Sequence, residues 1–192
     1  MRILLVRHGP SAHVHDGSWL RRRAVAGYED AYDAAGILPD CTPPDALTRV
    51  AASAQLICAS DLPRAVASAK RIARGRDVVT SPLLREIRLE PPPWIPLKLP
   101  IGVWDLFGHL QWSYRLLART DHEYVQRANA AAEWLEQRTR TAQTVVAVTH
   151  GAFRRILAVR LVMLGWRATR ARPRYEHWSV WAFERTAPVG EP

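Results

Sequence analysis

The chain has 192 residues, of which 48% are hydrophobic and 23% are charged, and this balance excludes a disordered or collagen-like protein. A chain of this length buries a hydrophobic core without disulfide or metal staples, so we expect one domain over residues 1–192. No apolar run approaches the length that crosses a bilayer, and we expect no membrane partner. Cys41 and Cys58 form no zinc or disulfide pattern, and no signal-peptide core is present, which together favour a cytoplasmic setting.

The net charge of +9 invites a nucleic-acid interpretation, because clustered cations neutralise phosphates. Lysine occurs only at Lys70 and Lys98, so arginines that are scattered from Arg2 to Arg185 carry nearly all of the positive charge. The one tight run, Arg21–Arg23, is more typical of a solvated loop or helix face than of a binding stripe. We therefore expect no specific nucleic-acid partner.

Short apolar and β-branched runs alternate with segments that begin at proline or an acidic residue, which is the pattern of strands alternating with helices. In chain order we predict a strand over 1–6, an irregular segment over 9–27, a helix over 45–54, a strand over 56–60, a helix over 63–74, a strand over 77–80, a helix over 121–140, a strand over 145–149, a helix over 151–165 and a strand over 178–183. This order predicts an α/β protein, a three-layer α/β/α sandwich with a mainly parallel central sheet.

Residues 91–120 interrupt this alternation with prolines and aromatic residues: Pro91–Trp94, Pro96, Pro100, Trp104, Phe107, Trp112 and Tyr114. A stretch of this composition inside an α/β chain is more typical of an insertion over the sheet than of the sheet itself. We predict an aromatic, proline-rich cap. We expect Trp94, Trp104 and Trp112 to pack in the cap or core rather than to stack on nucleic-acid bases.

Two short strings place a histidine directly after a predicted buried strand. Arg7-His8-Gly9 follows the first strand, and His150-Gly151 follows the strand that precedes the last long helix. In an open α/β sheet, ligands bind outside the carboxyl ends of the strands, so we expect both histidines to face one pocket. Imidazole and guanidinium groups together suit a phosphate dianion.

A neutral His8 imidazole can attack phosphorus and carry the phosphoryl group as phosphohistidine. Neighbouring arginines disfavour the imidazolium and so lower the pKa of His8, while Gly9 lets the backbone approach a ligand closely. His150 and the helix start at Gly151 can stabilise charge on the phosphoryl oxygens. Each charge contact at about 4 Å is worth about 4 kcal/mol at an effective dielectric of about 20, so arginines and imidazoles hold a dianion without a metal or cofactor.

Three further side chains are candidates for the same chemistry. Arg64, in the string Ser60–Ala65, lies near a helix start, where anions are favoured, although a surface arginine would give the same pattern. Glu86 follows the strand over 77–80 and can protonate a leaving oxygen and later activate water. Glu90 is the rival acid, and taken alone either glutamate is more simply interpreted as a solvated side chain.

The combination resembles the histidine phosphatase family, also called the phosphoglycerate mutase-like family. Its signature is an early Arg-His-Gly, an arginine in a Ser-x-Leu-x-Arg-Ala string, a glutamate after the third strand and a late His-Gly. These elements occur here in that order, and the resemblance runs from about residue 1 to residue 183. It implies that His8 is the phosphorylated nucleophile, that Glu86 is the general acid and base, and that His150 assists catalysis. It implies a phosphate pocket formed by Arg7, Gly9, Arg64, His150 and Gly151.

The chain departs from the family pattern at two places. After Gly9 it has Pro10, Ser11 and Val14, where the family often has an acidic residue or Gln, then Ser or Thr, and then Asn. After Glu86, a proline-rich string replaces the family's Gly-x-x-Glu-Gly-type string. The second departure argues against a phosphoglycerate mutase proper.

We therefore expect a metal-independent phosphomonoester hydrolase that acts on a small phosphorylated substrate. A phosphoglycerate mutase-like phosphoryl transferase is the nearest alternative, and a non-catalytic phosphate- or polyanion-binding module is an alternative of another class. His13-x-His15-Asp16 has a spacing that some metal sites use, but no third ligand cluster is near, so we expect no metal. The sequence leaves the substrate and the oligomeric state open, with a homodimer as one option.

Overall fold

The computed structural model describes residues 1–13, 17–117, 122–169 and 174–186. His15 and Asp16, which were considered as metal ligands, lie outside the described residues. Within the described ranges, no helix is both long and apolar enough to cross a membrane.

The central sheet has six strands in the order β4-β3-β6-β1-β8-β7. Its strands are β1 (Arg2–Arg7), β3 (Leu56–Ser60), β4 (Val79–Ser81), β6 (Thr144–Thr149), β7 (Arg167–Ala168) and β8 (Val180–Glu184). The pairs β1–β6, β6–β3 and β3–β4 are parallel, whereas β8 pairs antiparallel with both β1 and β7. The sheet is mainly parallel, as predicted.

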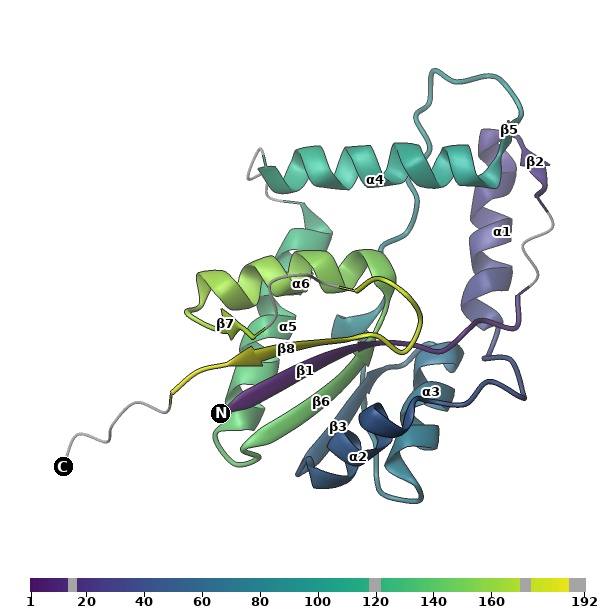
Figure 1. The fold of residues 1–192 in the computed structure, drawn as a ribbon. Helices are drawn as coiled ribbons and strands as arrows, with labels where there is room; N and C mark the ends of the chain where they lie inside the picture. Colours follow the sequence, from purple (N-terminus) through teal and green to yellow (C-terminus); the bar gives the residue numbers. More distant parts are fainter. Residues whose placement is uncertain (14–16, 118–121, 170–173, 187–192) are drawn as a thin grey trace.

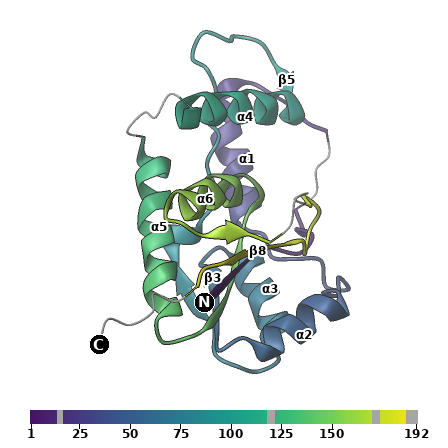
Figure 2. The same cartoon turned by 60° about the vertical axis from the view of Figure 1, so that its left-hand side comes forward.

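Helices cover both faces of this sheet, which makes three layers (Figures 1 and 2). The helices are α2 (Asp45–Ser53) and α3 (Pro63–Ala73) on one face, and α5 (Glu123–Thr139) and α6 (Gly151–Met163) on the other. Successive side chains of a strand point to opposite faces. Ile3 and Leu5 therefore pack in the cluster with α5 and α6, and Leu4 and Val6 pack in the cluster with α2 and α3. This two-sided burial explains why β1 is a continuous apolar run.

A separate cap lies over the carboxyl end of the sheet and is built from two segments that are far apart in the sequence (Figure 1). Its helices are α1 (Arg22–Ala34) and α4 (Ile101–Leu117), and its short strands β2 (Trp19–Leu20) and β5 (Leu99–Pro100) pair antiparallel. Val25 of α1 packs with Ile101 and Trp104 of α4 in a third apolar cluster.

The prediction of an irregular segment over residues 9–27 is wrong, because β2 and the start of α1 lie within it. Gly27 lies inside α1, but one glycine costs a helix only about 1 kcal/mol, and packing of the cap outweighs that cost. Val25, Tyr28 and Tyr32 have the i, i+3, i+7 spacing of a helix face. The predicted cap over residues 91–120 is therefore only half of the observed cap.

Other boundaries shift by one to three residues, which is the usual scatter at element ends. The strand predicted over 77–80 is β4 at Val79–Ser81, followed by a 3-10 turn over Pro82–Leu84, and β7 was not predicted. Of the cap tryptophans, Trp104 and Trp112 are buried as expected, but Trp94 is 77% exposed, so the expectation that it packs is wrong.

The cap depends on Trp104, which is 1% exposed and donates a hydrogen bond from Nε1 to the Leu20 carbonyl at 3.0 Å. We expect Trp104→Ala to lower the free energy of unfolding of the cap by about 3–5 kcal/mol. Hydrogen exchange of α1 and α4 amides measures this loss. Leu106→Ala on the same helix, where the side chain is 58% exposed, is the matched control and should change it by less than about 0.5 kcal/mol.

Candidate active site

The parallel pairing of β1 with β6 places His8 beside His150. Arg7 pairs with Thr149 in the strand register, and the next backbone N–H, that of His8, donates to the Thr149 carbonyl at 3.0 Å. Both strands therefore end at the same edge of the sheet, and the residue that follows each strand is a histidine. The two imidazole centroids are 5.1 Å apart, and both residues are buried.

His8 is held in one tautomer by the backbone. Its Nδ1 lies 2.6 Å from the Gly9 carbonyl, and because a carbonyl only accepts, Nδ1 carries the proton in the neutral ring. The lone pair is then on Nε2. Burial is the largest cause that lowers the pKa of His8 to about 3, and the nearby Arg64 and Arg7 lower it further. At neutral pH the imidazole is uncharged, which is the state a nucleophile needs.

His150 is fully buried at the start of α6. Burial, followed by the charges of His8 and Arg64, lowers the pKa of His150 well below its usual value. Neither ring nitrogen of His150 has a hydrogen-bond partner among the described residues, and the same is true of Nε of Arg7 and Nε of Arg64. Buried polar atoms are rarely left unpaired, so these nitrogens are suited to a polar ligand.

Arg7 and Gly151 lie against each other at the carboxyl edge of the sheet. A Cβ atom on Gly151 would stand 3.5 Å from the Arg7 guanidinium carbon, which is ordinary van der Waals contact and shows how close the guanidinium lies to the start of α6. Arg7 Nη1 also donates to the Tyr175 carbonyl at 2.5 Å. The structure therefore brings Arg7, Gly151 and both histidines together.

Arg64 lies in the first turn of α3 and is fully buried. Its Nη1 donates to the Tyr32 carbonyl and its Nη2 to Asp33 Oδ1, each at 3.0 Å. The guanidinium carbon lies 4.1 Å from the centre of the Tyr32 ring. Arg64 is close enough to lower the pKa of His8, but its two terminal nitrogens bind the end of α1.

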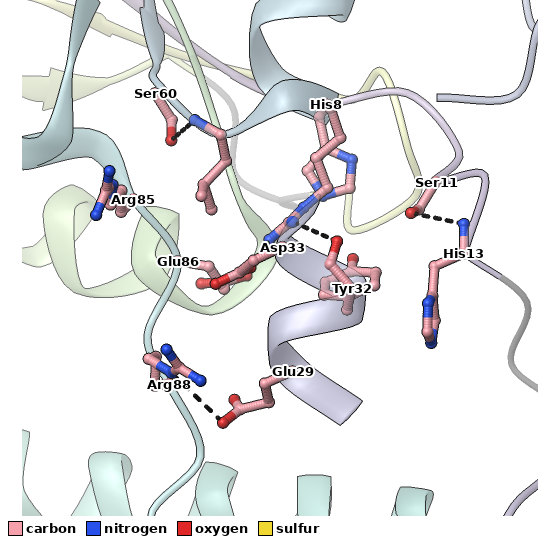
Figure 3. Close-up of polar contacts among 12 residues, drawn as sticks. His8, Ser11, His13, Glu29, Tyr32, Asp33, Ser60, Arg85, Glu86 and Arg88 are labelled. Atoms are coloured by element: carbon pink, nitrogen blue, oxygen red, sulfur yellow. Dashed lines mark hydrogen bonds and ion pairs between the residues drawn. The ribbon is translucent and has the colours of Figure 1, made fainter. Parts of the chain in front are cut away.

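Glu86 caps the N-terminus of α6 (Figure 3). Its carboxylate accepts from the backbone N–H of Phe153 at 2.8 Å, of Ala152 at 3.2 Å and of Ile87 at 3.0 Å. A carboxylate is favoured there by the free N–H groups and the dipole of the helix. The contact places Glu86 next to His150. Glu90 instead pairs with His122 at 3.4 Å and does not line the cavity that Glu86 shares with Arg7, although both glutamates line a second cavity of about 370 Å³.

A cavity of about 310 Å³ opens above this edge of the sheet. Its residues include Arg7, Glu86, Gly151, Arg154, Arg155 and Tyr175 from the sheet side, and Tyr28, Glu29, Tyr32, Asp33, Asp105 and His109 from α1 and α4. The cavity thus has arginines on its floor and carboxylates on its cap side. Among the described residues, no group of three or more His, Cys, Asp or Glu side chains is arranged to hold a metal ion.

No family model and no curated protein sequence matches the chain. Among solved structures, a mutant phosphoserine phosphatase from Entamoeba histolytica in complex with phosphoserine is similar at a TM-score of 0.53 and 17% identity, over 84% of this chain and 80% of that chain. A mycobacterial glucosyl-3-phosphoglycerate phosphatase is similar at 0.50 and 17%, over 82% and 77%. A putative alpha-ribazole-5'-P phosphatase from Escherichia coli is similar at 0.51 and 18%, over 84% and 80%. The chain has the histidine phosphatase fold.

Within this histidine phosphatase fold, Gly9 does not have the role expected from the sequence. Its N–H donates to Ser68 Oγ at 2.8 Å and its carbonyl accepts from His8. The space that a Cβ would fill is taken by the Trp178 indole, whose Cζ2 would lie 2.4 Å away. The close approach that requires glycine is therefore to a tryptophan rather than to a ligand, and we no longer place Gly9 in the phosphate pocket.

The loop before β8 is a part of the site that the sequence analysis missed. His177 lies with its ring centroid 5.5 Å from that of His8, and Trp178 adopts a left-handed φ of 64° that is unusual for a bulky residue. Buried Arg154 holds this loop, because its Nη1 donates to the Ser179 carbonyl at 2.8 Å and its Nη2 to Ser179 Oγ at 3.0 Å. No local pattern in residues 174–179 marks a site. The contact between His177 and His8 exists only because β8 returns beside β1.

The lowered pKa of His8 makes stability depend on pH. The unfolded protein takes up the proton near pH 6.5 and the folded protein only near pH 3, so stability is full above about 6.5 and falls as the pH drops between these values. We expect His8→Asn, which keeps a donor for Gly9, to reduce the loss at about pH 4.5 by on the order of 2 kcal/mol. Urea unfolding of both proteins at about pH 7 and pH 4.5 measures the difference. If both proteins lost the same free energy of unfolding between these two pH values, His8 would not be buried in its neutral form.

Proposed function

We propose that this protein is a phosphomonoester hydrolase that works through a phosphohistidine on His8 without a metal. The observation that carries the proposal is the tautomer of His8: Nδ1 donates to the Gly9 carbonyl, which leaves the Nε2 lone pair as the nucleophile. The lowered pKa keeps the ring uncharged at neutral pH. Arg7 and Arg64 match the charge of a phosphate dianion, and the uncharged His150 offers a hydrogen bond beside them.

In the first step, the Nε2 lone pair of His8 attacks phosphorus, and the bond between phosphorus and the leaving oxygen breaks. A proton on Glu86 passes to that oxygen, and the alcohol leaves. In the second step, water attacks the phosphohistidine while the Glu86 carboxylate takes a proton from the water. The bond from phosphorus to Nε2 breaks, and orthophosphate departs from a neutral His8 and a protonated Glu86.

The remaining groups act on the phosphoryl oxygens. Arg7 and Arg64 supply positive charge, and His150 supplies a hydrogen bond in a site from which bulk water is excluded. Gly151, at the start of α6, lies against the Arg7 guanidinium. The helix N-terminus fixes the Glu86 side chain in place, and its position in the cavity that Arg7 also lines favours Glu86 over Glu90 as the general acid and base.

The similar structures support a small phosphorylated substrate, since those that are named act on phosphoserine, glucosyl-3-phosphoglycerate or alpha-ribazole-5'-phosphate. A cavity of about 310 Å³ is large enough for such a molecule. We propose a single domain with no specific nucleic-acid partner. We also place it in the cytoplasm, because Cys41 and Cys58 are both free thiols.

His8→Ala removes the nucleophile, so we expect turnover of p-nitrophenyl phosphate to fall at least about 1000-fold, and acid-labile phosphoryl labelling of the protein to disappear. The release of orthophosphate, measured with malachite green, distinguishes a hydrolase from a mutase, because a mutase retains the phosphoryl group. His109→Ala, at a cavity residue outside the proposed chemistry, is the control. Normal turnover by His8→Ala would exclude the phosphohistidine mechanism.

Glu86→Gln should slow the reaction most for substrates whose leaving oxygen needs a proton. We expect a loss of about 100-fold in kcat for an alkyl phosphate and a smaller loss for p-nitrophenyl phosphate, because nitrophenolate leaves without protonation. Glu90→Gln is the matched control and should leave both rates within about twofold. If Glu90→Gln showed the substrate-dependent loss instead, the acid would be Glu90.

A further inference from the structure

Arg64 is bound by the end of α1, although its charge lowers the pKa of the proposed nucleophile, His8, more than that of Arg7 does. Both of its terminal nitrogens are engaged, one by the Tyr32 carbonyl and one by the Asp33 carboxylate, each at 3.0 Å. The guanidinium also lies on the face of the Tyr32 ring. Among the described residues, the hydrogen-bond acceptors that contact this cation therefore come from two consecutive residues of α1.

Asp33 lies in the wall of the cavity and contacts the buried Arg64. Its side chain is 27% exposed and lines the cavity together with Arg7 and Glu86. Figure 3 shows Tyr32 and Asp33 at the end of α1 nearest His8, with Glu86 on the neighbouring loop. His8 is only 1% exposed, so a substrate in the cavity reaches Nε2 only after something above it moves.

A carboxylate and a phosphoryl group bind a guanidinium through the same kind of hydrogen bond. Both are anions whose oxygens accept N–H hydrogen bonds from its fork, and the Asp33 carboxylate already accepts one from Nη2 of Arg64. If both were close to Arg64, the carboxylate would repel a phosphate dianion in a region of low dielectric. Asp33 and the substrate phosphate therefore compete for the positive charge of Arg64, and most directly for its Nη2.

We propose that Asp33 is an internal competitor for the phosphate-binding arginine and sets the affinity of the site. This inference rests on the proposed function, because it takes Arg64 as a phosphate ligand. The substrate's phosphoryl group displaces the Asp33 carboxylate from Arg64, and the carboxylate turns to the solvent of the cavity. The end of α1 moves away from His8 in the same step, which opens Nε2 to the phosphorus. Each binding event then includes the cost of breaking one buried ion pair.

Asp33→Asn is the most direct test, because asparagine keeps the shape and a carbonyl acceptor for Arg64 but removes the charge. We expect inorganic phosphate, measured by calorimetry, to bind about tenfold more tightly, and KM for p-nitrophenyl phosphate to fall to a similar degree without loss of kcat. Asp30→Asn is the matched control. Asp30 lies on the same helix with its side chain 67% exposed and pairs with Arg88, so both constants should stay within about twofold.

A different outcome would overturn the inference. Weaker phosphate binding by Asp33→Asn would show that Asp33 positions Arg64 for the ligand, and a fall in kcat confined to alkyl phosphates would make Asp33 the proton donor. Unchanged affinity would show an ordinary structural ion pair. Calorimetry needs no turnover, so phosphate binding can respond to Asp33→Asn even if His8→Ala shows that the proposed mechanism is wrong.

Hydrogen exchange of the unaltered protein gives an independent test that does not depend on a variant that folds. Saturation with inorganic phosphate should speed the exchange of the backbone amides at residues 31–34, because the contacts of Tyr32 and Asp33 with Arg64 are released. Slower exchange there would mean that the ligand binds beneath an unmoved α1. That result would contradict the displacement of Asp33.

Discussion

The site depends on the parallel ladder between β1 and β6. Because Arg7 lies opposite Thr149, the two strands end in step, and His8 and His150 come next to each other. A shift of one residue in this register would turn alternate side chains of one strand from one helical layer to the other, and both clusters of core residues would lose their packing. The same apolar burial that stabilises the sheet therefore sets the spacing of the two imidazoles.

Burying so many polar groups at one edge of a sheet requires partners for them, and the backbone provides most of these. The His8 ring uses the Gly9 carbonyl, the Glu86 carboxylate uses the N–H groups at the start of α6, and Arg154 uses the Ser179 carbonyl. Backbone groups do not titrate, so their contacts persist across a wide range of pH. Both ring nitrogens of His150 and Nε of Arg7 and Arg64 lack a partner among the described residues and lie at the proposed phosphate site, although nitrogens without a partner also occur elsewhere, as at Trp112 and Arg160.

The cap adds acidic side chains to the cavity at the carboxyl edge of the sheet. The sheet brings arginines to the floor of the cavity, whereas α1 brings Glu29 and Asp33 to its other side. Burial raises the pKa of Glu29 to about 7, although a hydrogen bond from Leu89 and the charge of Arg88 oppose the shift. A cavity with opposite charges on its two walls holds its own ion pairs until a ligand replaces one partner. The Arg64–Asp33 pair is the contact at which the two walls meet.

The apolar runs, the helix starts at proline and the four motif strings were enough to predict the layers of the sandwich and the meeting of His8 with His150, because these depend on periodicity and on where parallel strands end. The sequence by itself also marked Arg7, Arg64, Glu86 and Gly151. Only the tertiary structure decided what the site residues contact. The Trp178 indole packs against Gly9, Glu86 caps α6, and Asp33 binds Arg64. These partners are between 31 and 169 positions apart in the sequence, and no local pattern encodes a contact between α1, the loop before β8 and the ends of the strands. Such contacts arise when the core and the cap pack, and packing is a property of the whole chain.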